Sequence, residues 1–166
     1  MKKHKGFTLV ELLIVIVIIG ILASSMLLSS SSATASAEAA NIVSELRNLK
    51  AATMMFFADS MDAVNRGEAN SVINSGNSAK ILLGKYIDNP EKISTLYLFR
   101  QTNVSTGSKW FVGFDLTNAT SELKEKLQGR AAATGLYGTS GTSCPTDLGG
   151  SGIFKVSDKV VWVVAR

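Results

Sequence analysis

The chain has 166 residues, and its 17 Lys and Arg against 13 Asp and Glu give a formal net charge of +4. Three of those lysines lie among the first six residues; without them 14 basic side chains face 13 acidic ones, which leaves no basic face for nucleic acid. The one histidine is His4 and the one cysteine is Cys144, so His-based acid–base chemistry, Cys–His pairs and most zinc sites are excluded from Phe7 onward. We therefore expect no enzyme, no cofactor and no metal, and a single domain beyond any membrane segment.

A long apolar segment begins near the N-terminus. Residues 7–28 contain one charged side chain, Glu11, and as a helix they would span about 33 Å, enough to cross the hydrocarbon core of a bilayer. The next charge is Glu38. Lysines before the segment, and none close after it, place the N-terminus in the cytoplasm. We therefore predict a single-pass precursor in the inner or cytoplasmic membrane, with its C-terminus outside.

Glu11 separates this segment from an ordinary secretory signal peptide. Residues 23–25, Ala-Ser-Ser, could form a signal cleavage site. A signal core, however, gains nothing from a carboxylate, which costs about 2.5–3.5 kcal/mol at the centre of a spanning helix. Another alternative is that the Glu11 side chain snorkels to the headgroups about one turn away.

The stretch KGFTLVELLIVIVIIGILA resembles the class III signal peptide of type IV pilins and of the related pseudopilins. In this family a prepilin peptidase cuts a short basic leader after its final glycine and methylates the new terminal amine. The resemblance covers about the first 25 residues. It implies a leader at residues 1–6, cleavage between Gly6 and Phe7, methylation of Phe7, and a role of Thr8 and Glu11 in subunit assembly. It also implies a homopolymer built by an inner-membrane pilus assembly platform.

Elementary electrostatics gives Glu11 a matching role. Cleavage before Phe7 creates a cationic amine at the start of an apolar helix. A charge buried alone is costly, whereas a charge paired with an opposite one recovers much of that cost. Assembly should therefore be favoured in a stagger that brings the amine of one subunit to the Glu11 carboxylate of the next.

A second helical segment follows without a break. Residues 24–37 are mostly small and polar and contain no proline or glycine, so they continue the helix although Ser and Thr form it weakly. Further on, one helical face is largely apolar, with Ile42, Leu46, Leu49, Thr53, Phe57, Met61 and Val64. Arg66 and Gly67 are typical of a helix end. We therefore predict one long helix, with residues 7–28 as its transmembrane or filament-core half and residues 29–66 as its continuation.

Two positions in this helix bear on its stiffness. Gly20 matches a helix-weakening glycine of the pilin family, whereas Leu28 stands where many members have a proline. We expect any loosening of the helix inside a filament to fall in the serine run at residues 29–32 instead.

Residues 67–166 are expected to form a globular head with the alternation of β-strands. The stretches at 94–101 and 109–116 predict one hairpin, and IFKVSDKVVWVVA predicts a second hairpin with a short turn. Residues 122–127 predict a short helix capped near Thr120. The predicted fold class is therefore α+β: a long N-terminal helix whose second half packs on an antiparallel sheet of about four strands. In KWFVGFDL, the side chains expected on one face of the sheet are Trp110, Val112, Phe114 and Leu116.

Weaker signals in the head predict ordinary surface features. The Gly/Ser/Thr-rich residues 134–152 lack the ending of a phosphate loop and predict a mobile surface loop. Cys144 has no second cysteine in the chain to bridge to, which predicts a free or buried thiol, with a disulfide between chains as the alternative. Asn103 and Asn118 match the glycosylation acceptor pattern but are interpreted as turn residues.

The acidic residues do not predict a metal site. Asp59 and Asp62 share a side of the helix, but no further ligands except Glu68 lie near them, which favours a solvated face. Secretion pseudopilins often bind calcium in a C-terminal loop, yet Asp147 and Asp158 are too sparse to predict this here.

The sequence as a whole predicts a structural filament subunit, most simply that of a type IV pilus exported to the cell surface for adhesion, motility or DNA uptake. One alternative is a pseudopilin of a type II secretion or competence system, because both kinds of protein use the same signal. Another is a membrane-anchored extracytoplasmic binding protein. The long Gly/Ser loop favours the pilus subunit, and no convergent catalytic set favours an enzyme.

Overall fold

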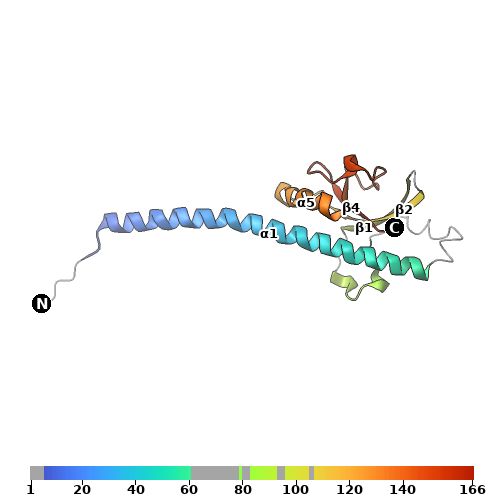
Figure 1. Ribbon diagram of the computed structural model, residues 1–166. Coiled ribbons are helices and arrows are strands. Elements are labelled where there is room, and N and C mark those ends of the chain that lie inside the picture. Colours follow the sequence, from blue (N-terminus) through green and yellow to red (C-terminus); the bar gives the residue numbers. More distant parts are fainter. Residues whose placement is uncertain (1–5, 61–78, 80–82, 93–95, 105–106) are drawn as a thin grey trace.

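The computed structural model describes residues 6–60, 79, 83–92, 96–104 and 107–166. A long helix runs out of a compact head in which the described residues form a sheet, helix α5 and short 3-10 turns (Figure 1). In chain order the elements are α1 (Leu9–Asp59), η1 (Gly84–Tyr86), η2 (Pro90–Lys92), β1 (Tyr97–Val104), β2 (Gly107–Asp115), α5 (Ser121–Thr134), β3 (Leu136–Thr139), η3 (Gly150–Gly152) and β4 (Val160–Val164). The predicted α+β class is confirmed.

Helix α1 runs without a break from its predicted first half into its second half, as far as Asp59. Residues 9–27 are exposed on every side and extend away from the head (Figure 1). The predicted apolar face of the second half packs on the head: Ile42, Leu46, Leu49 and Thr53 are buried, and Phe57 is half-buried. The helix ends at Asp59 with Ser60 as its C-cap. The other predicted positions of this face, Met61 and Val64, and the helix end predicted at Arg66 and Gly67, lie outside the described residues.

The sheet contains four antiparallel strands in the order β1-β2-β4-β3. The first predicted hairpin is confirmed, with Tyr97 opposite Phe114 and Val104 opposite Gly107. Its predicted buried face is also confirmed, because Trp110, Val112 and Leu116 are buried in the main core and Phe114 packs against it.

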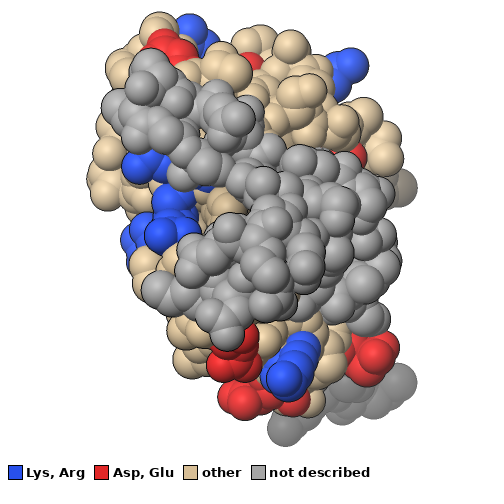
Figure 2. Space-filling model, turned by 90° about the vertical axis from the view of Figure 1, so that its right-hand side faces the viewer, with Lys and Arg blue, Asp and Glu red and all other residues tan. Residues whose placement is uncertain are grey.

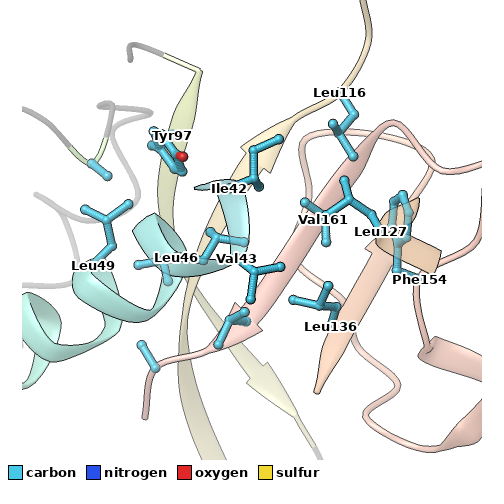
Figure 3. Packing of buried hydrophobic residues seen from close by; sticks show 14 of the residues in the cluster. Ile42, Val43, Leu46, Leu49, Tyr97, Leu116, Leu127, Leu136, Phe154 and Val161 are labelled. Carbon is cyan, nitrogen blue, oxygen red and sulfur yellow. The ribbon is translucent and has the colours of Figure 1, made fainter. Parts of the chain in front are cut away.

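The main core lies between α1, the sheet and α5 (Figure 3). Val43 and Leu46 of α1 point toward Val161 of β4 and Leu136 of β3, and Leu127 of α5 lies behind them with Phe154 (Figure 3). These side chains are all less than a tenth exposed. The contact with the sheet and α5 holds the second half of α1, whereas the apolar window of its first half is not buried by any described residue.

The second predicted hairpin is wrong. Strand β4 pairs with β2 and β3, and residues 153–156 form no strand beside it. These residues form a turn instead, in which the Lys155 amide donates to an Asp158 carboxylate oxygen at 2.8 Å and the Asp158 amide donates to the Lys155 carbonyl at 2.9 Å. Because the turn takes up these backbone groups, the edge of β4 is free to pair with β3.

The prediction of a mobile loop over residues 134–152 is wrong in part. Residues 136–139 form strand β3, and Trp162, Phe111 and Val160 make a second core on the outer face of the sheet. Cys144 and Leu148 pack against this second core. The segment after β3 therefore covers a sheet face that α1 does not reach.

Helix α5 confirms the predicted short helix and is longer than expected. The Thr120 hydroxyl accepts a hydrogen bond from the Leu123 amide at 3.3 Å, which caps its N-terminus. Its C-cap is Gly135, with φ of 68°, a left-handed conformation that glycine adopts without strain. This glycine turns the chain directly into β3.

Two glycines of the head should respond in opposite directions to the same substitution. A Cβ at Gly113 would collide with the indole ring of Trp162, whereas a Cβ at Gly129 in α5 meets nothing within 4 Å. Gly113→Ala should therefore lower the free energy of unfolding by about 1–3 kcal/mol through overpacking. Gly129→Ala should raise it by about 0.4–1 kcal/mol, because alanine restricts the unfolded chain.

Thermal and denaturant unfolding of the full chain in detergent, followed by tryptophan fluorescence, measures both changes. A Gly113→Ala protein as stable as the parent would contradict the packing of Trp162 across β2. A destabilised Gly129→Ala protein would contradict the exposed position of that glycine in α5.

Candidate functional site

The start of α1 is built around Thr8 and Glu11. Thr8 is the N-cap, and its hydroxyl accepts a hydrogen bond from the Glu11 amide at 3.2 Å. In return, one carboxylate oxygen of Glu11 (Oε2) accepts from the Thr8 amide at 2.8 Å and from the Thr8 hydroxyl at 2.6 Å. This reciprocal arrangement is a capping box, which satisfies backbone donors that a helix start leaves without partners.

The capping box gives Glu11 a function inside its own chain that the sequence analysis missed. The signal was present, because Thr8-Leu9-Val10-Glu11 has the spacing of a threonine followed three residues later by a glutamate. A carboxylate in the first turn also interacts favourably with the helix dipole. Among the hydrogen bonds of the described residues, both that reach the carboxylate go to Oε2, so the second oxygen is left to accept another donor.

Gly6 and Phe7 lie outside the helix, in a non-helical lead-in that precedes the cap. The Phe7 side chain is 82% exposed, and a Cβ built on Gly6 meets nothing within 4 Å. The backbone at Gly6 also avoids the left-handed region, because Gly135 is the one glycine with positive φ among the described residues. Nothing in the described part of the chain therefore requires glycine at position 6 or covers the bond between Gly6 and Phe7.

The apolar half of α1 carries the largest exposed hydrophobic surface of the described residues. Its large apolar side chains between Leu9 and Leu27 are each about half or more exposed. Helix α1 is long and apolar enough to cross a membrane, and the apolar window packs against nothing else in the described chain. A soluble monomer rarely exposes such a surface, so this half of the helix requires lipid or other protein around it.

Polar side chains in the middle of α1 are satisfied within the helix. The Ser24 hydroxyl donates to the Gly20 carbonyl at 2.8 Å, and the Ser25 hydroxyl donates to the Leu22 carbonyl at 2.8 Å. Thr34 donates in the same way to the carbonyl of Ser31 at 2.8 Å. Because these hydroxyls need no outside partner, this stretch can lie against apolar neighbours while it stays helical.

Residues 1–27 match the family model described as the prokaryotic N-terminal methylation motif. This motif marks the class III signal of type IV pilins and pseudopilins. The α1-on-sheet architecture is also similar to that of pilin-like proteins. No curated protein and no solved structure matched the chain.

The methylation motif also bears on processing and location. Pilin-like proteins are generally structural and non-enzymatic, and the methylation motif implies processing by a prepilin peptidase and assembly by dedicated machinery. The apolar helix behind a class III signal indicates a membrane precursor with an extracytoplasmic head.

The acidic and thiol side chains of the head serve the pilin-like fold. Asp59 lies 4.0 Å from the ammonium of Lys85, while Asp62 and Glu68 lie outside the described residues. Asp147 accepts from the Gly149 amide at 2.7 Å and from the Ser151 hydroxyl, so it closes its own loop. In the described part of the chain, no three potential metal ligands come together.

The remaining candidate residues of the head also have local places. Cys144 is half-buried against the second core. Asn118 lies exposed in the turn after β2, as predicted, whereas Asn103 lies within β1 and not in a turn.

Proposed function

We propose that this pilin-like chain is the structural subunit of a type IV pilus, which polymerises through its N-terminal helix into an extracellular filament. The observation that carries the proposal is the exposed apolar half of α1, which begins at a capped carboxylate and lies entirely outside the head. A simple membrane anchor needs the apolar residues and does not need Glu11. A filament needs both, because the carboxylate gives neighbouring helices a defined stagger.

Glu11 is the residue whose energetics separate a filament from an anchor. In the membrane precursor it lies at the end of the apolar segment, where its own capping box supplies two donors. In a filament core, however, apolar helices would surround it and close its route to water. Because a buried charge without a partner is strongly destabilising, the carboxylate then requires an opposite charge. Cleavage before Phe7 supplies that charge as the terminal amine of a neighbouring subunit.

The proposed division of the chain follows from these roles. Residues 1–6 are the leader, removed by a prepilin peptidase between Gly6 and Phe7, with methylation of the Phe7 amine. Residues 7–28 are the transmembrane or filament-core helix, residues 29–66 continue it, and residues 67–166 form the head. The inner-membrane assembly platform moves the cleaved subunit from the bilayer into the growing homopolymer.

Thr8 is proposed to act in assembly by positioning Glu11. Its amide and hydroxyl both hold Oε2, which leaves Oε1 as the oxygen for the ammonium of a neighbour. The capping box and the contact between subunits can therefore exist at the same time.

The experiment that tests the proposed function compares native cells with a strain from which this chain is deleted. A pilus subunit predicts that deletion removes surface fibres, whereas secretion and its substrates continue. A pseudopilin predicts blocked secretion or DNA uptake with surface fibres intact, and a membrane-anchored binding protein predicts neither change. Either of the last two outcomes would refute the pilus assignment.

A further inference from the structure

The proposed filament leaves open how the heads of neighbouring subunits meet, and the inference below rests on that proposed function. Identical subunits in an open helical filament contact one another through two different patches, one from each side of the interface. The head should therefore carry two complementary patches on different sides. The charged side chains around α1 provide such a pair.

The first patch is a hollow between α1 and the η1 region, here called the acidic hollow. It is an open cavity of about 490 Å³ lined by Glu45, Asn48, Ala51, Ala52, Met55, Tyr86, Ile87, Asp88 and Asn89. Two of these residues are carboxylates and none is basic, while the alanine, methionine and isoleucine side chains give it apolar walls. Such a lining fits a lysine, whose stem packs on apolar surface and whose ammonium meets a carboxylate.

The second patch is the turn at residues 155–159 before β4, here called the lysine turn. Lys155 and Lys159 are exposed, and the neighbouring Lys124 of α5 donates to the Asp158 carbonyl at 3.1 Å. The Asp158 carboxylate accepts the Lys155 amide of the same turn. The turn and the adjoining residue of α5 thus carry three lysines, and the one carboxylate of the turn accepts a backbone amide. No ion pair between this turn and another described residue occurs in the structure.

The two patches lie on different sides of α1. Figure 1 shows η1 and η2 on one side of the helix, and α5 with the sheet and its loops on the other. Acidic side chains, with a basic one between them, lie at the lower edge of the end view in Figure 2, which is the edge where η1 and η2 lie in Figure 1. A neighbour placed beside the head can therefore present one patch to the other.

The positions along α1 agree with the stagger that Glu11 requires. The lysine turn contacts α5 through Lys124. Helix α5 in turn lies beside residues 36–38 of α1, because the Arg130 guanidinium donates to the Ser36 carbonyl and Leu123 lines a hollow together with Glu38. From Glu38 to Glu45 is seven residues, or about 10 Å along the helix. When Phe7 of one subunit lies level with Glu11 of the next, the first subunit is displaced by about 6 Å along the helix axis. This displacement runs from the N-terminus toward the C-terminus of α1, as does the step from Glu38 to Glu45. The remaining few ångströms lie within the reach of a lysine side chain.

We propose that the lysine turn of one subunit docks into the acidic hollow of the next subunit in the filament. Lys155 and Lys159 meet Glu45 and Asp88 across this contact. Ion pairs at a partly exposed interface contribute little affinity, about 0–1 kcal/mol each, so the apolar helices still supply most of the stability. The charge pattern instead selects the register and the correct neighbour, because a wrong register places like charges together.

Charge reversal tests this contact in native cells that lack the wild-type chain. Lys155→Glu with Lys159→Glu should lower the yield of sheared filaments about tenfold, and Glu45→Lys with Asp88→Lys should do the same. All four substitutions in one chain restore the complementarity and should restore most of the yield. The control is Arg47→Glu with Lys109→Glu, which reverses two charges outside both patches and should leave the yield unchanged.

Cysteine crosslinking gives a second test of the contact, which does not require the head to fold with reversed charges. In a Cys144→Ala chain, Glu45→Cys with Lys155→Cys should give a ladder of disulfide-linked subunits in oxidised filaments, and either cysteine alone should not. Filaments without a ladder, or wild-type yields from both charge reversals, would overturn the proposed contact while leaving the pilus function intact. A wild-type chain that forms no filaments would refute the pilus function instead.

Discussion

A Gly6→Leu precursor should remain uncut in the inner membrane and yield no filaments. The fold itself does not need this glycine, because a Cβ there meets open space and the backbone avoids the left-handed region. Any loss therefore reflects the prepilin peptidase, whose site must accept the residue before the Gly6–Phe7 bond. Immunoblotting measures the size of the chain, and mass spectrometry of the membrane fraction measures its N-terminus.

The matched control for this substitution is Gly20→Ala, at a second glycine with open space around it. Its precursor should be cut normally, and the mature chain should begin with methylated Phe7. A Gly6→Leu chain recovered with that same methylated terminus would contradict the processing site. If neither variant is cut correctly, the defect lies in membrane insertion in general.

Glu11→Gln should be cleaved like the wild type and yet yield at least about tenfold fewer filaments. Glutamine also serves at the third position of a capping box, so the start of α1 should keep its cap. What the substitution removes is the negative charge that balances the terminal ammonium of a neighbour. The variant thus separates the function of Glu11 within its chain from its proposed function between chains.

The control for this charge is Glu38→Gln, at the next charged residue of α1, whose side chain is exposed on the helix surface. It should assemble normally, because that side chain can reach water in the proposed filament. Sheared filament yield, divided by the amount of cleaved subunit in the membrane, measures both variants. Equal yields from Glu11→Gln and wild type would remove the electrostatic account of assembly.

The parts of the fold that local sequence determines were predicted correctly. The apolar period of residues 42–57 gave the buried face of α1, and alternation around Trp110 gave the first hairpin with its buried side. Thr120 is a threonine directly before an apolar helical pattern, which is why the cap of α5 was also visible. Each of these features depends on residues close together in the chain.

The parts that depend on distant residues were missed. Strand β3 is only four residues long, too short for a clear alternation of apolar and polar side chains, and it pairs with the edge of β4 that the turn at residues 155–159 leaves free. The burial of Cys144 and Leu148 likewise depends on Trp162 and Phe111, which lie on the outer face of the sheet. No short-range pattern in residues 140–150 reveals that a second core lies beneath them.

The Thr8–Glu11 capping box was missed for a different reason. Its spacing is local and readable, but the charge of Glu11 in an apolar segment drew the interpretation toward a contact with another subunit. The structure gives the carboxylate a partner in its own chain, and the proposed neighbour would take its other oxygen.

Electron microscopy of surface material sheared from wild-type and deletion cells tests the central claim most directly. The account predicts long fibres a few nanometres wide in the wild type, built mainly from this chain beginning at methylated Phe7, and none in the deletion strain. Restoring the gene should restore the fibres. Identical fibres from both strains, with this chain absent from them by mass spectrometry, would contradict its assignment as the subunit of a surface pilus.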